Sequence, residues 1–486
     1  MNKTGWTQRA SRQLGITAVL ESNRNVHLIL LTRFLRMFAY GSSTLILAIY
    51  FAALGFSDTE IGLFMTLTLV GDVFISLLLT VVADGLGRRR ILTFGSLLMA
   101  LSGVCFASVT TYWILLLAAV VGVISPSGNE IGPFRAVEES TLAHLSKPET
   151  RSDIFAWYVV LGTLGASGGS LAGGWITQAL QAAGWSNISS FRLIFAIYAG
   201  MGIFKAGVTL LLDDQCEATG ATTARSRTRR QEDESEEEHN RFLTDEGQPS
   251  EPAPELPPKR KHMFAQISQK SRTTLAKLCS IFLLDSLASG MVPNSLIAFY
   301  MERKFGMSEG RLGTIISAAQ FISSLGNIFA SCVAKRIGLV RAMVFTHLPS
   351  AIFLALLPVP SSLALTVALL IARSSLASMD QAPRSAFLLA IVLPEERTAV
   401  MGIVNTVKTM SQSSGPLITG VLAGSGRFWI ALVLAGSLKA CYDLGMLRMF
   451  AKVKLAGDQP NRQSNIGSNE RNATYHELHA LGSDDE

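Results

Sequence analysis

The segment Ala83-Asp-Gly-Leu-Gly-Arg-Arg-Arg90 follows an apolar run and has a counterpart 251 positions later, Ala334-Lys-Arg-Ile-Gly-Leu-Val-Arg341, which also follows an apolar run. Two further pairs of segments, each 246 positions apart, repeat this correspondence: Pro148-Glu-Thr-Arg151 with Pro394-Glu-Glu-Arg397, and Gly169–Gly174 with Gly415–Gly420. Three matches at a near-constant offset indicate that the chain consists of two repeats of one structural unit.

The composition around these repeats is that of a membrane protein. The chain has 486 residues, of which 49% are apolar and only 16% charged, against about 25% charged in an ordinary soluble protein. Much of the charge lies in 1–25, 213–273 and 452–486, which leaves two apolar blocks, 26–212 and 274–451. Neither block has enough polar surface to cover a soluble domain. We therefore expect a polytopic membrane protein.

Six spans fit each block, because a helix needs about 20 apolar residues to cross the hydrocarbon. The expected spans are 27–53, 61–82, 91–109, 112–133, 154–177, 191–212, 277–300, 312–333, 341–358, 362–383, 399–423 and 427–450. The predicted fold is an all-α membrane protein with 12 transmembrane helices in two six-helix bundles. Its parts are a tail (1–25), a bundle (26–212), a linker (213–273), a second bundle (274–451) and a second tail (452–486).

Basic residues predict the topology. Arg24 lies in the first tail and Arg88–Arg90 in the second connection, whereas the first and third connections carry no lysine or arginine. Both termini and the linker are therefore expected in the cytosol, with the protein in the plasma membrane or an organelle membrane. One connection does not fit this topology: it carries Arg303, Lys304 and Arg311 but falls on the predicted outer face. The linker is basic, then acidic, then proline-rich, which predicts a disordered tether, with a regulatory docking site as the alternative.

Two six-helix halves joined by a loose linker resemble the major facilitator superfamily over essentially all of 26–450. Asp84-Gly-Leu-Gly-Arg-Arg-Arg90 is similar to that superfamily's loop motif between spans two and three, although Thr80 and Gly85 depart from it. The resemblance implies two bundles that rock about a site at the midplane. It also implies a cytosolic gate at this loop, with Asp84, Gly87, Arg88 and Arg89 as candidates. Glu130 and Asp380 lie at matching places near the ends of spans four and ten, where they are expected to hold Arg88 and Arg384 in that gate, with a static ion pair at a helix end as the alternative.

A second motif lies in the fifth span. Gly165-Ala-Ser-Gly-Gly169-Ser-Leu-Ala-Gly173-Gly174 resembles the antiporter motif of the drug and proton antiporter families, with Ser170 in place of proline. Small residues let helices approach closely and bend, so a plain packing face is the alternative. The candidate hinge residues are Gly165, Gly169, Gly173, Gly174, Gly415 and Pro416. The fourth span, Leu115–Gly128, lacks the arginine that those exporters usually carry.

Ionisable residues inside the spans are candidates for a substrate or coupling site, because each costs about 2.5–3.5 kcal/mol to insert. On the helices that line the cavity according to the resemblance, they are Arg33, Arg36, Asp72, Asp285, Arg373 and Lys408. Their net charge of +2 favours a substrate with an anionic group. A rise of about 1.5 Å per residue places Arg36 and Asp72 at one level, as a structural pair or as a functional one. Lys439 and Asp443, one turn apart outside the cavity, are expected to pair with each other.

These patterns favour a secondary active transporter over an enzyme, because no acid and base residues accompany a nucleophile. We expect export of amphipathic or anionic compounds by alternating access. The alternatives are proton-coupled uptake of an organic anion or nutrient, and a transporter-like sensor. The expected partners are a small solute, protons and lipid, with no nucleic acid, no cofactor and no metal, since the five cysteines lack metal-type spacing. We expect a monomer.

Overall fold

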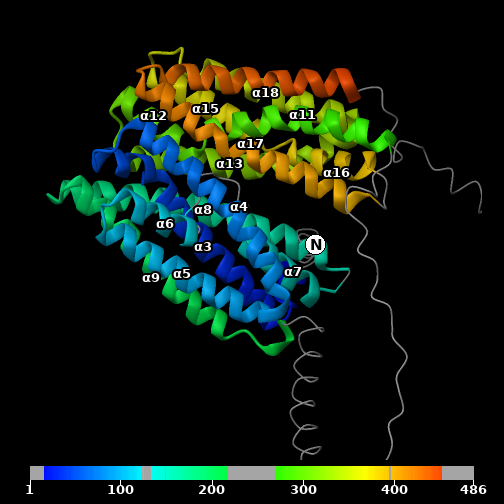
Figure 1. Cartoon of the computed structure of the whole chain (residues 1–486), viewed down its shortest axis with the longest axis horizontal. Helices are drawn as coiled ribbons and strands as arrows, with labels where there is room; N and C mark the ends of the chain where they lie inside the picture. The colour runs from blue at the N-terminus through cyan, green and yellow to red at the C-terminus, as the bar shows by residue number, and fades with distance from the viewer. Residues whose placement is uncertain are drawn as a thin grey trace, which may run out of the picture.

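The computed structural model describes residues 16–122, 124, 133–147, 149–216, 269–392 and 396–450, and within these ranges it is helical with no strand. The two halves of the chain form two helical layers, blue to green and green to red in Figure 1. The linker segment 217–268 and the tails 1–15 and 451–486 lie outside the described residues, so their predicted disorder stays a prediction.

The first half crosses the molecule six times. Its helices are α2 (Ile16–Leu20), α3 (Arg24–Ala53), α4 (Asp58–Leu86), α5 (Arg88–Ser108), α6 (Tyr112–Gly122), α7 (Pro133–Leu145), α8 (Arg151–Ala182) and α9 (Asn187–Leu210), with a short 3-10 turn, η1, at Asp214–Cys216. The fourth crossing comprises α6 and α7.

The second half repeats this order. Its helices are α11 (Gln269–Met291), α12 (Asn294–Phe305), α13 (Glu309–Ile337), α14 (Leu339–Leu356), α15 (Leu363–Ala377), α16 (Gln381–Ile391), α17 (Arg397–Gly424) and α18 (Phe428–Phe450). The seventh crossing comprises α11 and α12, and the tenth comprises α15 and α16. The predicted fold of two six-helix bundles is confirmed.

Seven of the described helices are long and apolar enough to cross a membrane by length and composition. They are α3, α5, α8, α9, the part of α11 from Arg272, α14 and α18. The expected continuous spans 277–300 and 362–383 are in fact broken. Pro293 precedes α12, and its ring and missing N–H prevent α11 from continuing through it. At the other break, Asp380 precedes α16.

The loop repeat has a structural cause in two glycines. Gly87 between α4 and α5 has φ 88°, and Gly338 between α13 and α14 has φ 85°. A side chain rarely adopts this conformation, so glycine is favoured at both sharp reversals. The repeat detected in the sequence therefore marks the same turn in both halves.

The two halves are joined at one end of the molecule, which we call the closed end, where the connections 54–57, 183–186, 306–308 and 425–427 lie. A single cluster of buried apolar residues there takes members from both halves, including Phe51, Phe64, Leu296 and Phe428. At the opposite end, near residues 216 and 269, each half has its own separate cluster. We call this the linker end, and α7 and α16 lie there (Figure 1).

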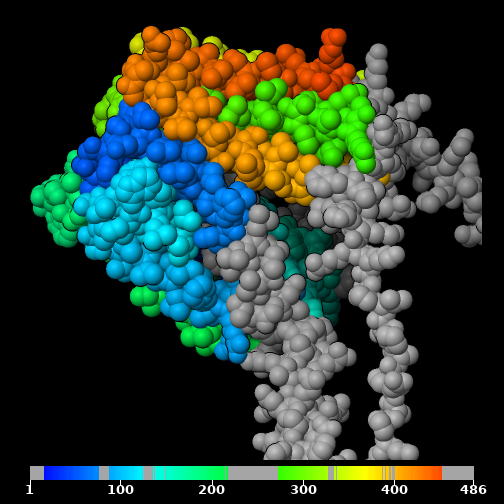
Figure 2. All heavy atoms as spheres, in the orientation of Figure 1, coloured from blue at the N-terminus to red at the C-terminus, as the bar shows by residue number. Residues whose placement is uncertain are grey.

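Close backbone contacts hold the closed end together. A Cβ on Gly62 of α4 would overlap Pro416 and Gly420 of α17, and one on Gly174 of α8 would overlap Glu309 of α13. Packing this tight requires glycine at these positions. In Figure 2 the surfaces of the two halves meet at this end. The structure is therefore the state in which the closed end is sealed.

Candidate solute-binding cavity

A cavity of about 280 Å³ lies within the second half. Its walls come from α11 to α18, and it includes the break between α11 and α12 and the break between α15 and α16. Such breaks place polar backbone and side chains inside a bundle, where a solute can reach them. Of the candidate site residues, Asp285, Arg373, Asp380, Arg384 and Lys408 line this cavity, whereas Arg33, Arg36 and Asp72 do not.

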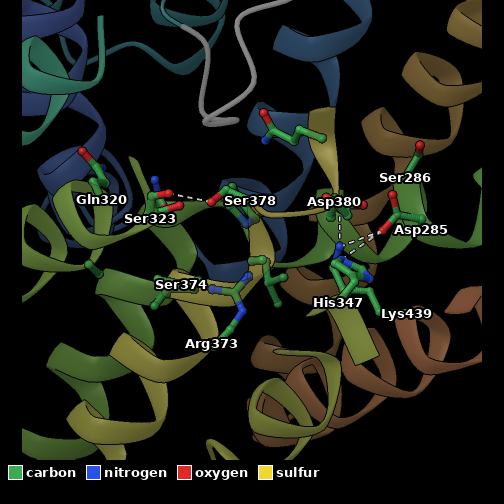
Figure 3. Close-up of a pocket in the computed structure, with 18 of the residues that line it drawn as sticks. Asp285, Ser286, Gln320, Ser323, His347, Arg373, Ser374, Ser378, Asp380 and Lys439 are labelled. Atoms are coloured by element: carbon green, nitrogen blue, oxygen red, sulfur yellow. Dashed lines mark hydrogen bonds and ion pairs between the residues drawn. The ribbon is translucent and has the colours of Figure 1, made fainter. Parts of the chain in front are cut away.

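One wall of the cavity is an ionic cluster centred on Asp285 (Figure 3). The Asp285 carboxylate accepts hydrogen bonds from Lys439 Nζ at 2.8 Å and from Arg384 Nη1 at 2.8 Å. Arg384 also donates to Asp380, one helical turn earlier, as the sequence predicts for these two residues. Lys439 donates a further hydrogen bond to Ser289 Oγ at 2.7 Å. A buried carboxylate is tolerated because several cations and donors surround it.

His347 also lines the cavity and connects this cluster to Asp443, which does not line it. Its Nδ1 lies 3.0 Å from both Asp443 oxygens, and its Nε2 lies 4.0 Å from Asp285. The expected pair between Lys439 and Asp443 is therefore wrong, because Lys439 is bonded to Asp285 and Asp443 faces His347. The neighbouring helices supply stronger partners than the next turn of α18 does.

The other wall is polar but carries a single charge, that of Arg373. Figure 3 shows Arg373 with Gln320, Ser323, Ser374 and Ser378 on the side of the cavity away from Asp285. Ser378 donates to the carbonyl of Ser323 at 2.7 Å, which links α13 to the break after α15. Hydroxyl and amide groups on this wall can donate to and accept from a polar solute.

Arg373 and Lys408 differ from the other cations of the cavity. Neither forms an ion pair with any carboxylate in the described part of the chain. The Lys408 ammonium lies 5.6 Å from the centre of the Phe282 ring, a cation–π contact that leaves its charge uncompensated. Two cations without a described carboxylate therefore face the cavity.

The first half has its own buried ionic network, centred on Glu138 of α7. Glu138 accepts a hydrogen bond from Arg36 Nη2 at 2.6 Å and one from the Tyr158 hydroxyl at 2.7 Å, and Lys205 Nζ lies 3.5 Å away. Arg33 stacks its guanidinium over the Tyr158 ring at 4.5 Å. Asp72 is buried on α4, and its predicted pairing with Arg36 stays a prediction.

The two networks occupy matching places with the charges exchanged. In the repeat, Arg36 of α3 corresponds to Asp285 of α11, and Glu138 of α7 corresponds to Arg384 of α16. Each pair ties the first helix of its half to the fourth crossing, and in each a lysine of the last helix contacts the acid. Glu138 was missed from the sequence because the fourth span was ended at 133. Glu138 lies 246 positions before Arg384, and this repeat spacing was the signal in the sequence that pointed to Glu138.

The candidate gate residues are only partly described. Arg88 donates to Ser140 Oγ at 2.8 Å and Arg89 donates to the Leu210 carbonyl at 2.5 Å, so both tie α5 to its own half. Glu130 and the side chain of Asp84 lie outside the described residues. Asp380 and Arg384 pair on the cavity wall, so the role of these residues as a cytosolic gate stays a prediction.

The candidate hinge glycines form a packing face. Cβ atoms on Gly165 and Gly169 would crowd Phe34 and Phe38 of α3, and one on Gly173 would crowd Ser42. Ser170, which replaces the motif's proline, donates to a carbonyl of α3 at 3.1 Å. In the second half, Gly415 approaches Gly290 and Met291 of α11 in the same way, and Pro416 lies inside α17. Hinge motion at these positions stays a prediction.

Two repeated helical bundles, the second of which encloses a polar cavity, have the architecture of a membrane transporter. The chain belongs to the Major Facilitator Superfamily, whose model matches residues 29–266 and 278–468. It is 34% identical over 443 residues to the uncharacterized membrane protein YJR124C of Saccharomyces cerevisiae, covering 89% of this chain and 96% of the yeast protein.

Solved structures share the fold. A bacterial homolog of the human lysosomal transporter Spinster, in an inward-facing and unoccupied conformation, matches with a TM-score of 0.64 and 14% identity, over 88% of this chain and 97% of that one. The nucleoside transporter NupG matches with a TM-score of 0.64 and 15% identity, over 89% of this chain and all of that one.

Proposed function

We propose that this protein is a secondary active transporter that moves a small organic anion across a membrane by alternating access. The observation that carries the proposal is the pair Arg373 and Lys408, which face the cavity without a described carboxylate partner. An uncompensated cation in a low-dielectric bundle is unfavourable until an anion joins it. The hydroxyl and amide groups beside Arg373 suit the polar remainder of such a solute.

The sealed end and the predicted topology together give the direction in which the cavity opens. If both termini are cytosolic, the closed end faces outward, and the structure is the inward-facing state. Two of the three basic residues between the seventh and eighth spans have partners that account for their place on this face. Arg303 is neutralised by Asp58 across the two halves, at 2.5 and 2.9 Å, and Lys304 donates to the carbonyls of Pro358 and Pro360.

Export is the transport direction that the Gly165–Gly174 motif favours. Proton-coupled uptake is the second candidate, and the observation that favours it is the buried His347 between Asp443 and Asp285 on the cavity wall. In both candidates the solute binds at the same cavity and carries an anionic group.

A thermal-shift screen of the purified protein tests the proposal, because a ligand that binds the native state raises its apparent stability. We would use benzoate, citrate and inorganic phosphate as anions, with glucose and choline as neutral and cationic compounds. We expect stabilisation by at least one anion and by neither of the other two.

Arg373→Gln and Lys408→Gln should each weaken the binding of that anion. A hydrogen bond to a charged group contributes about 1.5–3 kcal/mol, which is about 10- to 150-fold in affinity. Lys277→Gln is the matched control, since Lys277 is an exposed lysine of α11 away from the cavity. Stabilisation by choline alone, or anion binding that survives both cavity substitutions, would contradict the proposal.

A further inference from the structure

The lining of the cavity offers a solute hydrogen bonds but no aromatic ring for stacking. No phenylalanine, tyrosine or tryptophan is among the described residues that line it, and its apolar members, such as Ile316 and Leu370, are aliphatic. The Phe282 ring, which Lys408 contacts, is fully buried and does not line the cavity. Stacking on a ring, which often holds planar aromatic ligands, is therefore not available from these residues.

Three side-chain amides line the cavity from three different helices: Asn294 on α12, Gln320 on α13 and Gln412 on α17. None of the three forms a side-chain hydrogen bond within the part of the chain that the structure describes. The Gln320 amide oxygen is buried with no partner among these residues, and Figure 3 shows this side chain on the same side of the cavity as Arg373. Since buried polar groups are normally hydrogen-bonded, these amides require partners that enter the cavity, either water or solute.

The chemistry of an amide selects the group that can replace this water. An amide donates from its nitrogen and accepts at its oxygen, and a hydroxyl group can also do both. A carboxylate only accepts, and an alkyl or aryl group does neither. A solute that displaces the water but has no hydroxyl groups leaves the amides unpaired, which lowers its affinity.

We propose that the solute is a small polyhydroxylated carboxylate, a sugar acid in chemical class, and that Gln320 and Gln412 select it through its hydroxyl groups. This inference rests on the proposed function, because it needs the carboxylate at Arg373 and Lys408. The cavity volume of about 280 Å³ suits such a solute, since pockets for drug-sized ligands range from about 300 to 1,000 Å³. Large amphipathic compounds match neither the size nor the lining of this cavity.

The fold does not require these two glutamines. By the starts of the matching helices, Gln320 corresponds to Leu69 of α4 and Gln412 to Ala166 of α8. Both counterparts are buried, and the first half forms its bundle with an apolar side chain at each place. Helix packing alone therefore does not explain the polar side chains in the second half.

Two pairs of carboxylates that differ in their hydroxyl groups test the inference on the purified full-length protein. Gluconate is compared with hexanoate, and glucuronate with cyclohexanecarboxylate, by isothermal titration calorimetry. Each pair keeps one negative charge and a chain or ring of the same size. We expect at least one sugar acid to bind at least about tenfold more tightly than its hydroxyl-free analogue, because a site that hydrogen-bonds a hydroxyl group rejects analogues that lack it.

Variants of the two glutamines separate specificity from stability. Gln320→Met and Gln412→Met keep the length of the side chain and should each lower the affinity for the sugar acid about fivefold or more, while the affinity for the analogue stays nearly the same. A purely structural role would change both affinities together. Gln215→Met is the matched control, because Gln215 is exposed and does not line the cavity.

Analogues that bind as tightly as the sugar acids would overturn the inference, and so would an anion such as benzoate that binds when neither sugar acid does; both results leave the proposed function standing. A ratio of the two affinities that is unchanged in both methionine variants would overturn the selection by Gln320 and Gln412. The wild-type comparison decides the class of solute even where a variant does not fold. A protein that binds none of these anions, and neither citrate nor phosphate, overturns the proposed function instead.

Discussion

Replacing Glu138 by glutamine should strongly destabilise the protein, although the two side chains have nearly the same size. The Glu138 side chain is fully buried and is contacted by Arg36 at 2.6 Å, Tyr158 at 2.7 Å and Lys205 at 3.5 Å. Glutamine keeps the volume but removes the negative charge, which leaves two buried cations facing a neutral group. Breaking a buried pair in this way costs about 3–5 kcal/mol.

The neighbouring residue provides a matched control. Glu139 makes the same kind of contact with Arg135 one turn away at 2.6 Å, but these two side chains are 33% and 43% exposed. An exposed pair of this spacing contributes only about 0.3–0.5 kcal/mol. Glu139→Gln should therefore leave the free energy of unfolding nearly unchanged.

The purified variants in mild detergent are unfolded by titration with sodium dodecyl sulfate, which measures the difference in their free energies of unfolding. The double variant Glu138→Gln with Lys205→Met should regain part of the loss, because one stranded cation is then removed. If Glu138→Gln unfolds at the same denaturant concentration as Glu139→Gln, the network does not carry the stability assigned to it here.

Three other predictions concern the closed end and the linker. Arg303→Ala should raise the population of molecules with an open closed end by at most about fivefold, since a partly exposed ion pair contributes about 0.2–1 kcal/mol. The double variant Arg303→Asp with Asp58→Arg should restore the closed population, and spin-label distances between the halves that do not change in Arg303→Ala would show that the pair does not stabilise the closed end. Gly62→Val should prevent sealing of that end, whereas Gly402→Val, which meets open space, should not; equal cysteine accessibility in both variants would contradict the packing argument. A shortened but still spanning 217–260 should leave transport unchanged, because each doubling of loop length costs only about 0.6 kcal/mol, and a well-expressed inactive deletion would disprove a simple tether.

The two-bundle fold was predictable because its signals are local. The length of an apolar run indicates a membrane span. A turn with a positive φ, such as the one at Gly87, favours glycine in both halves. The break in the seventh span was not predicted, although Pro293 lies inside the expected span 277–300 and a proline interrupts the hydrogen bonds of a helix.

The partners of the buried charges were harder to predict. Residue counting gives the depth of Arg36 but not the direction in which its side chain points around the helix axis. Its contact with Glu138 joins residues 102 positions apart and depends on how α7 packs against α3. For the same reason, Lys439 and Asp443 were assigned to each other although each contacts a different helix. The cationic excess expected of the cavity was counted over six residues, of which only Asp285, Arg373 and Lys408 line the cavity in the second half, so that excess stays a prediction.

The exchanged charges of the two networks carry a consequence for the ancestry of the protein. If the halves descend from one duplicated ancestor, one of them has reversed both members of its pair, Arg36 with Glu138 or Asp285 with Arg384. A single reversal would place two like charges together inside the bundle, which costs far more than a neutral pair. The path between the two arrangements therefore runs through uncharged residues. Homologous sequences should include chains in which one of these pairs is neutral at both positions, and few in which only one member is reversed.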